Sequence, residues 1–115
     1  MKHSFEGIGQ WSATFACGSG VAEGKVVKVS ANGTVSACAD GNAFAGVVDV
    51  VGRDGTACAV ILGGMVEVPY TGTTPVLGWS GLSANGTGGV KADTNGRACL
   101  VVDVDTTGKL VTFVL

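Results

Sequence analysis

Apolar and polar residues alternate along most of this chain, and glycine interrupts the alternation every few residues. In the run Met65–Tyr70, valine or tyrosine at every second position alternates with methionine, glutamate and proline. A period of two places one face of a strand in the core and the other face outward. No window keeps apolar residues at the helical spacing of three and four. The pattern therefore predicts an all-β chain.

The same pattern predicts ten strands joined by tight turns. The predicted strands are Ala13–Cys17, Lys25–Ser30, Thr34–Ala37, Ala45–Val51, Ala57–Leu62, Met65–Tyr70, Leu77–Leu82, Gly89–Ala92, Ala98–Asp105 and Leu110–Leu115. Asn32-Gly33 and Asn85-Gly86 are typical of two-residue type I′ hairpins, which need positive φ at both central residues. Asp54-Gly55 predicts a similar turn.

Part of the sequence occurs twice. The segments Ser30–Leu62 and Ser83–Leu115 have equal length, and both begin with Ser-Ala-Asn-Gly-Thr. Both also contain Val-Val-Asp-Val, at residues 47–50 and 101–104, with one residue of slippage between them. We expect two pseudo-repeated halves that form a small closed or partly closed β-barrel or sandwich, because closure removes exposed strand edges.

The two ends of the chain differ in pattern, which predicts a domain boundary. Residues 1–20 are predicted to be an N-terminal arm, and residues 21–115 a single β-barrel domain. Within the domain, period two predicts that Val48 and Val50 share a face, as do Val102 and Val104. Asp49 and the other aspartates of these strands, Asp103 and Asp105, then point to solvent or to a partner.

Composition narrows the partners. Hydrophobic residues make up 46% of the chain and charged residues only 14%, with a net charge of −2 and scattered lysines and arginines. No basic stripe is present, so nucleic acid is not expected as a partner. No apolar run approaches the length of a membrane span, and no secretion signal is recognised at Met1. The few charges predict exposed apolar area, which usually marks a contact with another protein.

The sequence offers little for catalysis or metal binding. The one histidine is His3, so a triad would depend on a single residue in the predicted arm. Paired carboxylates among Asp49, Asp103 and Asp105 are the alternative, against simple solvation of valine-rich strands. We expect no catalytic residue, no metal and no cofactor. The four cysteines lack CxxC spacing and are expected to be free core thiols; disulfides, the alternative, need an oxidising compartment. They are Cys17, Cys38, Cys58 and Cys99.

Large side chains in exposed or polar contexts are the candidate interface residues. Trp11 lies in the predicted arm, where we expect an interface, and Trp79 is flanked by small residues, where it is either a core plug or an interface anchor. The outward face of the run Met65–Tyr70 adds further candidates. The full set is Phe5, Trp11, Met65, Glu67, Tyr70 and Trp79.

The order of short motifs from residue 21 to the end resembles a known family. These motifs are Gly24–Val27, Asn32–Val35, Gly46–Val48, Asp54-Gly55, Gly63–Tyr70, Thr74–Gly78, Gly88–Lys91 and Val101–Asp105. Together they resemble the small β-rich capsid cement, or head decoration, proteins of phages and prophages. The motifs are structural, mostly turns and strand ends.

The resemblance implies a compact β-barrel that binds the outside of a capsid lattice without catalysis. Its implied partners are the major capsid protein and further copies of itself, a trimer being one such homo-oligomer. Its implied location is the virion surface or the host bacterial cytoplasm. The alternative is a small ligand-binding β module for carbohydrate or peptide, using Trp79 and Tyr70. A small enzyme is a third class, which the scarcity of titratable groups disfavours.

Overall fold

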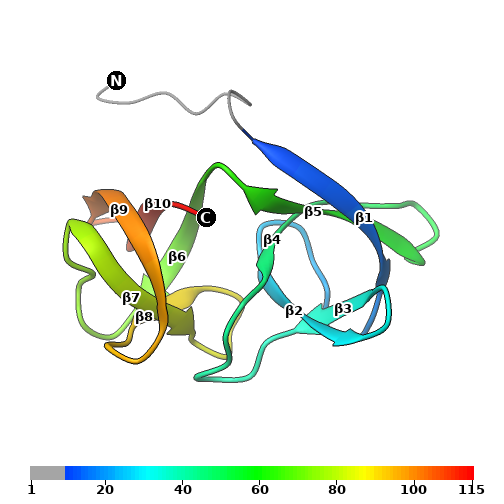
Figure 1. The fold of residues 1–115 in the computed structure, drawn as a ribbon, viewed down its shortest axis with the longest axis horizontal. Helices are drawn as coiled ribbons and strands as arrows, with labels where there is room; N and C mark the ends of the chain where they lie inside the picture. The colour runs from blue at the N-terminus through cyan, green and yellow to red at the C-terminus, as the bar shows by residue number, and fades with distance from the viewer. Residues whose placement is uncertain (1–9) are drawn as a thin grey trace.

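The computed structural model describes residues 10–115, which form strands and turns and no helix (Figure 1). The strands in chain order are β1 (Trp11–Cys17), β2 (Val26–Ala31), β3 (Thr34–Ala37), β4 (Gly46–Val51), β5 (Ala57–Gly63), β6 (Met65–Thr71), β7 (Gly78–Ala84), β8 (Val90–Ala92), β9 (Arg97–Asp105) and β10 (Leu110–Val114). Each predicted strand is present, with ends displaced by at most 2 residues. The all-β class is confirmed.

The two halves of the chain close two separate barrels that lie side by side (Figure 1). The first barrel has the order β1-β3-β2-β4-β5, and the second has the order β10-β6-β8-β7-β9. One parallel pair completes each ring, β1 with β3 and β6 with β8. The two-half organisation is thus confirmed. The halves do not share one barrel, however, because each has the five strands that it needs to close its own edges.

Three of the five ladders have the same register in the two barrels, whereas those of β3 and of its counterpart β8 differ. In the first barrel Val48 pairs with Val60, and in the second Val101 pairs with Phe113. Each residue of the second pair thus lies 53 positions after its counterpart in the first pair, at 101 against 48 and at 113 against 60. Residues separated by this step are called equivalent below. The step relates the pairing of β1 with β5 to that of β6 with β10, and the pairing of β2 with β4 to that of β7 with β9.

The repeat therefore begins at β1, well before the segment where the sequence displays it. Residues 12–17 are equivalent to Met65–Tyr70, and no residue is identical between them. Because β1 pairs with β5 and β3, residues 11–17 belong to the first barrel. The predicted arm over residues 1–20 is wrong for this part of the chain, and residues 1–9 lie outside the described residues.

A β-bulge occurs at equivalent places in the two barrels. In β4 the register shifts between Val48 and Val50, so Asp49 is the extra residue, and in β9 the extra residue is Val102. An extra residue reverses the facing of the residues after it. Val48 is consequently 1% exposed while Val50 is 50% exposed, which corrects the prediction that they share a face. In β9 it is Val104, not Val102, that packs against the core.

The two Asn-Gly turns differ from the prediction and from each other. Gly33 has a φ of 63°, but Asn32 does not adopt positive φ, so the first turn is not type I′. In the second barrel Ala84 pairs with Val90, which leaves a longer loop at residues 85–89. The Asn85 side chain organises that loop, because its Oδ1 accepts hydrogen bonds from backbone N–H groups within it. The second turn is thus an Asx-type loop and not a two-residue hairpin.

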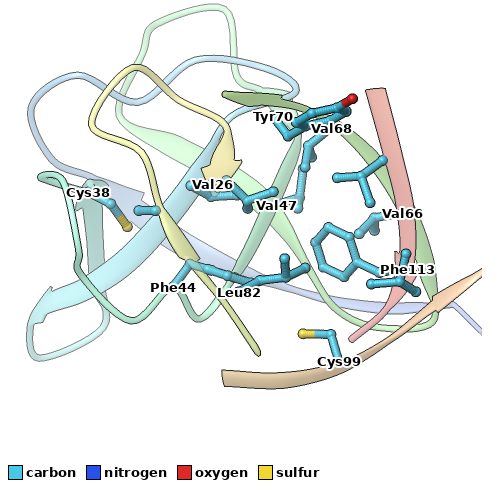
Figure 2. Close-up of a cluster of buried hydrophobic side chains, with 14 residues drawn as sticks. Val26, Cys38, Phe44, Val47, Val66, Val68, Tyr70, Leu82, Cys99 and Phe113 are labelled. Carbon is cyan, nitrogen blue, oxygen red and sulfur yellow. The ribbon is translucent and has the colours of Figure 1, made fainter. Parts of the chain in front are cut away.

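One apolar cluster joins the barrels. The core of the first barrel is small and separate, whereas the core of the second barrel continues into Val26, Phe44 and Val47 of the first (Figure 2). The Phe44 ring meets the Phe113 ring edge-on, with centroids 5.9 Å apart, and the Arg97 guanidinium lies 5.6 Å from the Phe44 centroid. An outer face of the first barrel is therefore buried against the second.

Candidate protein-interaction surface

Several large apolar side chains remain exposed on closed barrels. Within residues 10–115 they are Trp11, Val29, Val50, Val76, Leu77 and Trp79. Single exposed apolar residues are ordinary on soluble domains, but two exposed tryptophans are not, because burying an indole contributes much to binding. Since both barrels are closed, side chains and not strand edges are what these barrels offer to a partner.

Trp79 lies at the surface, so it is not the core plug that the sequence allowed as one of two interpretations. It is 75% exposed on β7, where its Cα partner is Leu100 on β9. Gly78 before it has a φ of 92°, a conformation that glycine adopts at little cost. Leu77 and Val76, which precede it, are exposed as well. This end of β7 concentrates the apolar exposure of the second barrel.

Trp11, at the start of β1, is 60% exposed and lies along the neighbouring strand β5. Its Cα partner is Gly63 on β5, and a Cβ atom at Gly63 would overlap the indole ring. Glycine at this position therefore allows the ring to lie flat against the strand. The preceding residue, Gln10, donates from Nε2 to the Met65 carbonyl oxygen at 3.0 Å, which attaches the start of β1 to β6.

The other candidate residues divide between core and surface. Tyr70 is 2% exposed in the core of the second barrel, so it does not lie at the surface where an interface was predicted. Met65 is half-buried, and Glu67 is exposed and accepts a hydrogen bond at 3.3 Å from the Thr112 hydroxyl. Phe5 lies outside the described residues. Sequence reasoning missed Val76 and Leu77, although their place beside Pro75 in a loop before a strand was a usable signal.

The described residues also form two hollows. One, of about 380 Å³, lies between the barrels, with Asp49 and Glu67 on its polar side and Val47 and Val66 on its apolar side. The other, of about 330 Å³, lies beside β7 and is lined by Thr74, Ser80 and Asp93 among others. The backbone N–H of Asn95 donates to Asp93 at 2.9 Å and holds the pKa of that carboxyl below its usual range. Asp93 is therefore a stable anion in the second hollow.

The predicted carboxylate pairings do not form a joint site. β4 lies between β2 and β5 in one barrel, and β9 lies between β7 and β10 in the other, so Asp49 and Asp103 are not on neighbouring strands. Asp105 instead caps a turn, where its Oδ1 accepts hydrogen bonds from the N–H groups of Thr107 and Gly108 at 3.0 Å. Across residues 10–115 no group of three or more His, Cys, Asp or Glu side chains is placed to hold a metal ion.

The cysteines are free thiols, as the sequence predicted. Cys38, Cys58 and Cys99 are buried, and Cys17 is half-buried beside the core of the first barrel. Burial, reinforced by a hydrogen bond with the Cys17 side chain, raises the pKa of the Cys58 thiol to about 11. Burial also raises the pKa of Cys38 and of Cys99. These three thiols act as small core residues.

We expect Cys58 and Cys99 to resist alkylation in the folded protein, because only the thiolate reacts and both groups are buried and protonated. Iodoacetamide labelling followed by mass spectrometry, with and without urea, measures this, and half-buried Cys17 is the internal reference that labels first. Equal labelling rates in the native and unfolded protein would contradict this expectation.

The free energy of unfolding should also fall as the pH rises from 9.0 to about 11, because in this range the Cys58 thiol of the unfolded chain loses its proton and that of the folded chain keeps it.

Comparison with known proteins does not add to these observations. Neither a scan against protein-family models nor a search of curated proteins found a match for this chain. In the part of the chain that the structure describes, no helix is long and apolar enough to cross a membrane.

Proposed function

We propose that this chain is a non-enzymatic structural protein that decorates and stabilises a phage or prophage capsid by binding the outer surface of the shell. The observation that carries the proposal is the exposure of Trp11, at 60%, on a closed barrel. Tryptophan is the side chain most enriched among residues that dominate protein–protein binding energy. The motif pattern described above, which resembles capsid cement proteins, supports the same proposal.

The architecture suits repeated attachment to a lattice. Each barrel pairs all its strands in a ring, so the protein can present apolar side chains without offering a strand edge for uncontrolled aggregation. A standard protein–protein contact buries about 1,600 Å² in total. Contacts repeated over many symmetry-related shell positions add avidity, so each one can be modest. The outcome is mechanical reinforcement without chemistry.

The direct test is cosedimentation with empty shells assembled from the major capsid protein of the same phage or prophage genome. We expect the chain to sediment with shells at saturable stoichiometry. Trp11→Ser should weaken binding about 30-fold or more, since loss of a tryptophan that dominates an interface costs about 2 kcal/mol or more. Val50→Ser, at an exposed position on β4, is the matched control and should bind normally. Wild-type chain that stays in the supernatant overturns the proposal.

A ligand-binding module is the second candidate, favoured by the hollow of about 330 Å³ beside β7. Ser80 and Asp93 line that hollow and could hydrogen-bond to sugar hydroxyls, and Trp79, exposed on β7 outside the lining, offers a stacking ring. Tyr70, the other ring considered for this role, is buried and is not available. Titration of tryptophan fluorescence with a panel of oligosaccharides tests it. Saturable quenching that Trp79→Ser abolishes would favour the module over the structural protein.

A further inference from the structure

The outer face of the second barrel carries a row of apolar residues that crosses four strands. Trp79 pairs with Leu100, Leu100 pairs with Val114, and Val114 pairs with Met65. Paired residues in neighbouring strands point to the same side of a sheet. Their inward neighbours Val66, Val101 and Phe113 are buried, so the row faces outward. We call these four residues the Trp79 row.

The equivalent row of the first barrel is already in use. It consists of Val26, Val47 and Ile61, which pair in the same way across β2, β4 and β5. Val26 is 1% exposed and Val47 is 4% exposed, because both pack into the cluster shared with the second barrel. The backbone N–H of Val26 also donates to the Gly88 carbonyl oxygen at 3.0 Å. In the first barrel, this face is therefore covered by a barrel of the same repeat.

The matching half of that contact lies at the end of β7. Ala84 accepts a hydrogen bond from the Gly41 N–H at 2.8 Å and donates to the Asn42 carbonyl oxygen at 2.9 Å. The Asp40 carboxylate, in the same loop, forms an ion pair with Lys91 at 3.0 Å. Phe44 completes the contact inside the shared cluster. A loop of the first barrel, residues 40–44, thus covers the β7 end.

Counterparts of both halves recur elsewhere within residues 10–115, where Trp79 and Val29 are exposed, although the β2 end closes with a two-residue turn where the β7 end has the 85–89 loop. The β2 end has the same Ser-Ala-Asn-Gly-Thr sequence as the β7 end, yet Ala31 is exposed where its equivalent Ala84 is 0% exposed. Val29 is likewise 56% exposed where its equivalent Leu82 is 0% exposed. The covering loop recurs too: Ala-Asp-Gly-Asn at residues 39–42 is matched by Ala-Asp-Thr-Asn at residues 92–95.

We propose that copies of this chain bind head to tail, with the Trp79 row and the 92–95 loop of one copy covering the Val29 and Ala31 end of the next. The contact repeats between chains the packing that already joins the two barrels within one chain. Such a contact uses two different surfaces, so it generates either a closed ring or an open filament. It needs no shell subunit, and its test is therefore independent of the shell-binding proposal.

The test is the mass in solution of the purified chain, by size-exclusion chromatography with light scattering. We expect the wild type to exceed the 11.3 kDa of one chain. Trp79→Glu and Val29→Glu should each reduce the mass to one chain, since each places a charge in one half of the contact. Val50→Glu, at an exposed position in neither half, should keep the wild-type mass. Circular dichroism verifies that all three variants are folded, as expected for changes at exposed positions.

Mixing the two defective variants distinguishes head-to-tail contact from any symmetric one. Val29→Glu retains an intact Trp79 row, and Trp79→Glu retains an intact Val29 end, so an equimolar mixture should form a complex of two chains. A two-fold contact through the Trp79 row alone would not be restored by mixing. A wild type that stays a single chain at millimolar concentration overturns the proposal. So does a mixture that stays at one-chain mass, or a Trp79→Glu variant that assembles like the wild type.

Discussion

Phe44→Ala should lower the free energy of unfolding by about 3–5 kcal/mol, the range for truncating a buried phenylalanine. The side chain is 3% exposed and lies outside its own barrel, edge-on to Phe113 in the second. Its removal would leave a cavity in the cluster that joins the barrels and would uncover the Arg97 guanidinium that now lies over the ring. For a domain of marginal stability this is a large share of the total.

Urea denaturation and calorimetry measure the effect. For a domain of this size, the loss corresponds to a Tm that falls by about 12 °C or more. Because Phe44 connects two barrels with otherwise separate strand ladders, its removal should also broaden the calorimetric transition toward two steps. Val50→Ala, at an exposed position, is the control and should change stability by less than about 0.5 kcal/mol. A loss below 1 kcal/mol for Phe44→Ala would show that the barrels do not depend on this contact.

The strands were predictable because local pattern decides them. Alternation and Gly-containing turns located all ten, and the valine-rich run that recurs in β4 and β9 showed that the chain contains a duplication. A bulge occurs at equivalent positions of the two copies, Asp49 and Val102, so comparing the copies does not reveal it. Period-two reasoning ignored it, because alternation cannot register an extra residue within a strand. The face of Val50 was therefore assigned wrongly.

The candidate surface was less predictable, because it depends on how the barrels pack. Val26 and Trp79 occupy equivalent positions on equivalent strands, yet one is 1% exposed and the other 75% exposed. The sequence of a strand does not show whether its outer face is covered by another barrel or left exposed. The same limit applies to β1, which resembles an arm until its pairing with β5 is known. Tertiary contacts, not strand propensity, determine these outcomes.

Gly46→Ala should destabilise the first barrel by about 3 kcal/mol, the upper end for forcing extra atoms into a packed interior. A Cβ atom at this buried position would overlap the Ile61 carbonyl oxygen and lie 2.8 Å from Val60 Cγ1. Neither neighbour can move easily, because both belong to β5 and are held in its ladders to β4 and β1. Gly46 does not have positive φ, so the expected cost is steric and not conformational.

Gly52→Ala is the matched control, since Gly52 also lacks positive φ and follows the same strand. There the added Cβ would lie 3.1 Å from the Ala57 carbonyl oxygen, and the exposed turn at Gly52 can shift by the few tenths of an ångström that this contact needs. The loss of unfolded-state freedom on replacing glycine stabilises either variant by about 0.4–1 kcal/mol. That gain should nearly cancel the strain at Gly52 and fall well short of it at Gly46. The second barrel accommodates Cys99 at the position equivalent to Gly46, so close approach of β4 to β5 is specific to the first barrel. Urea midpoints that coincide for the two alanine variants would contradict that close approach.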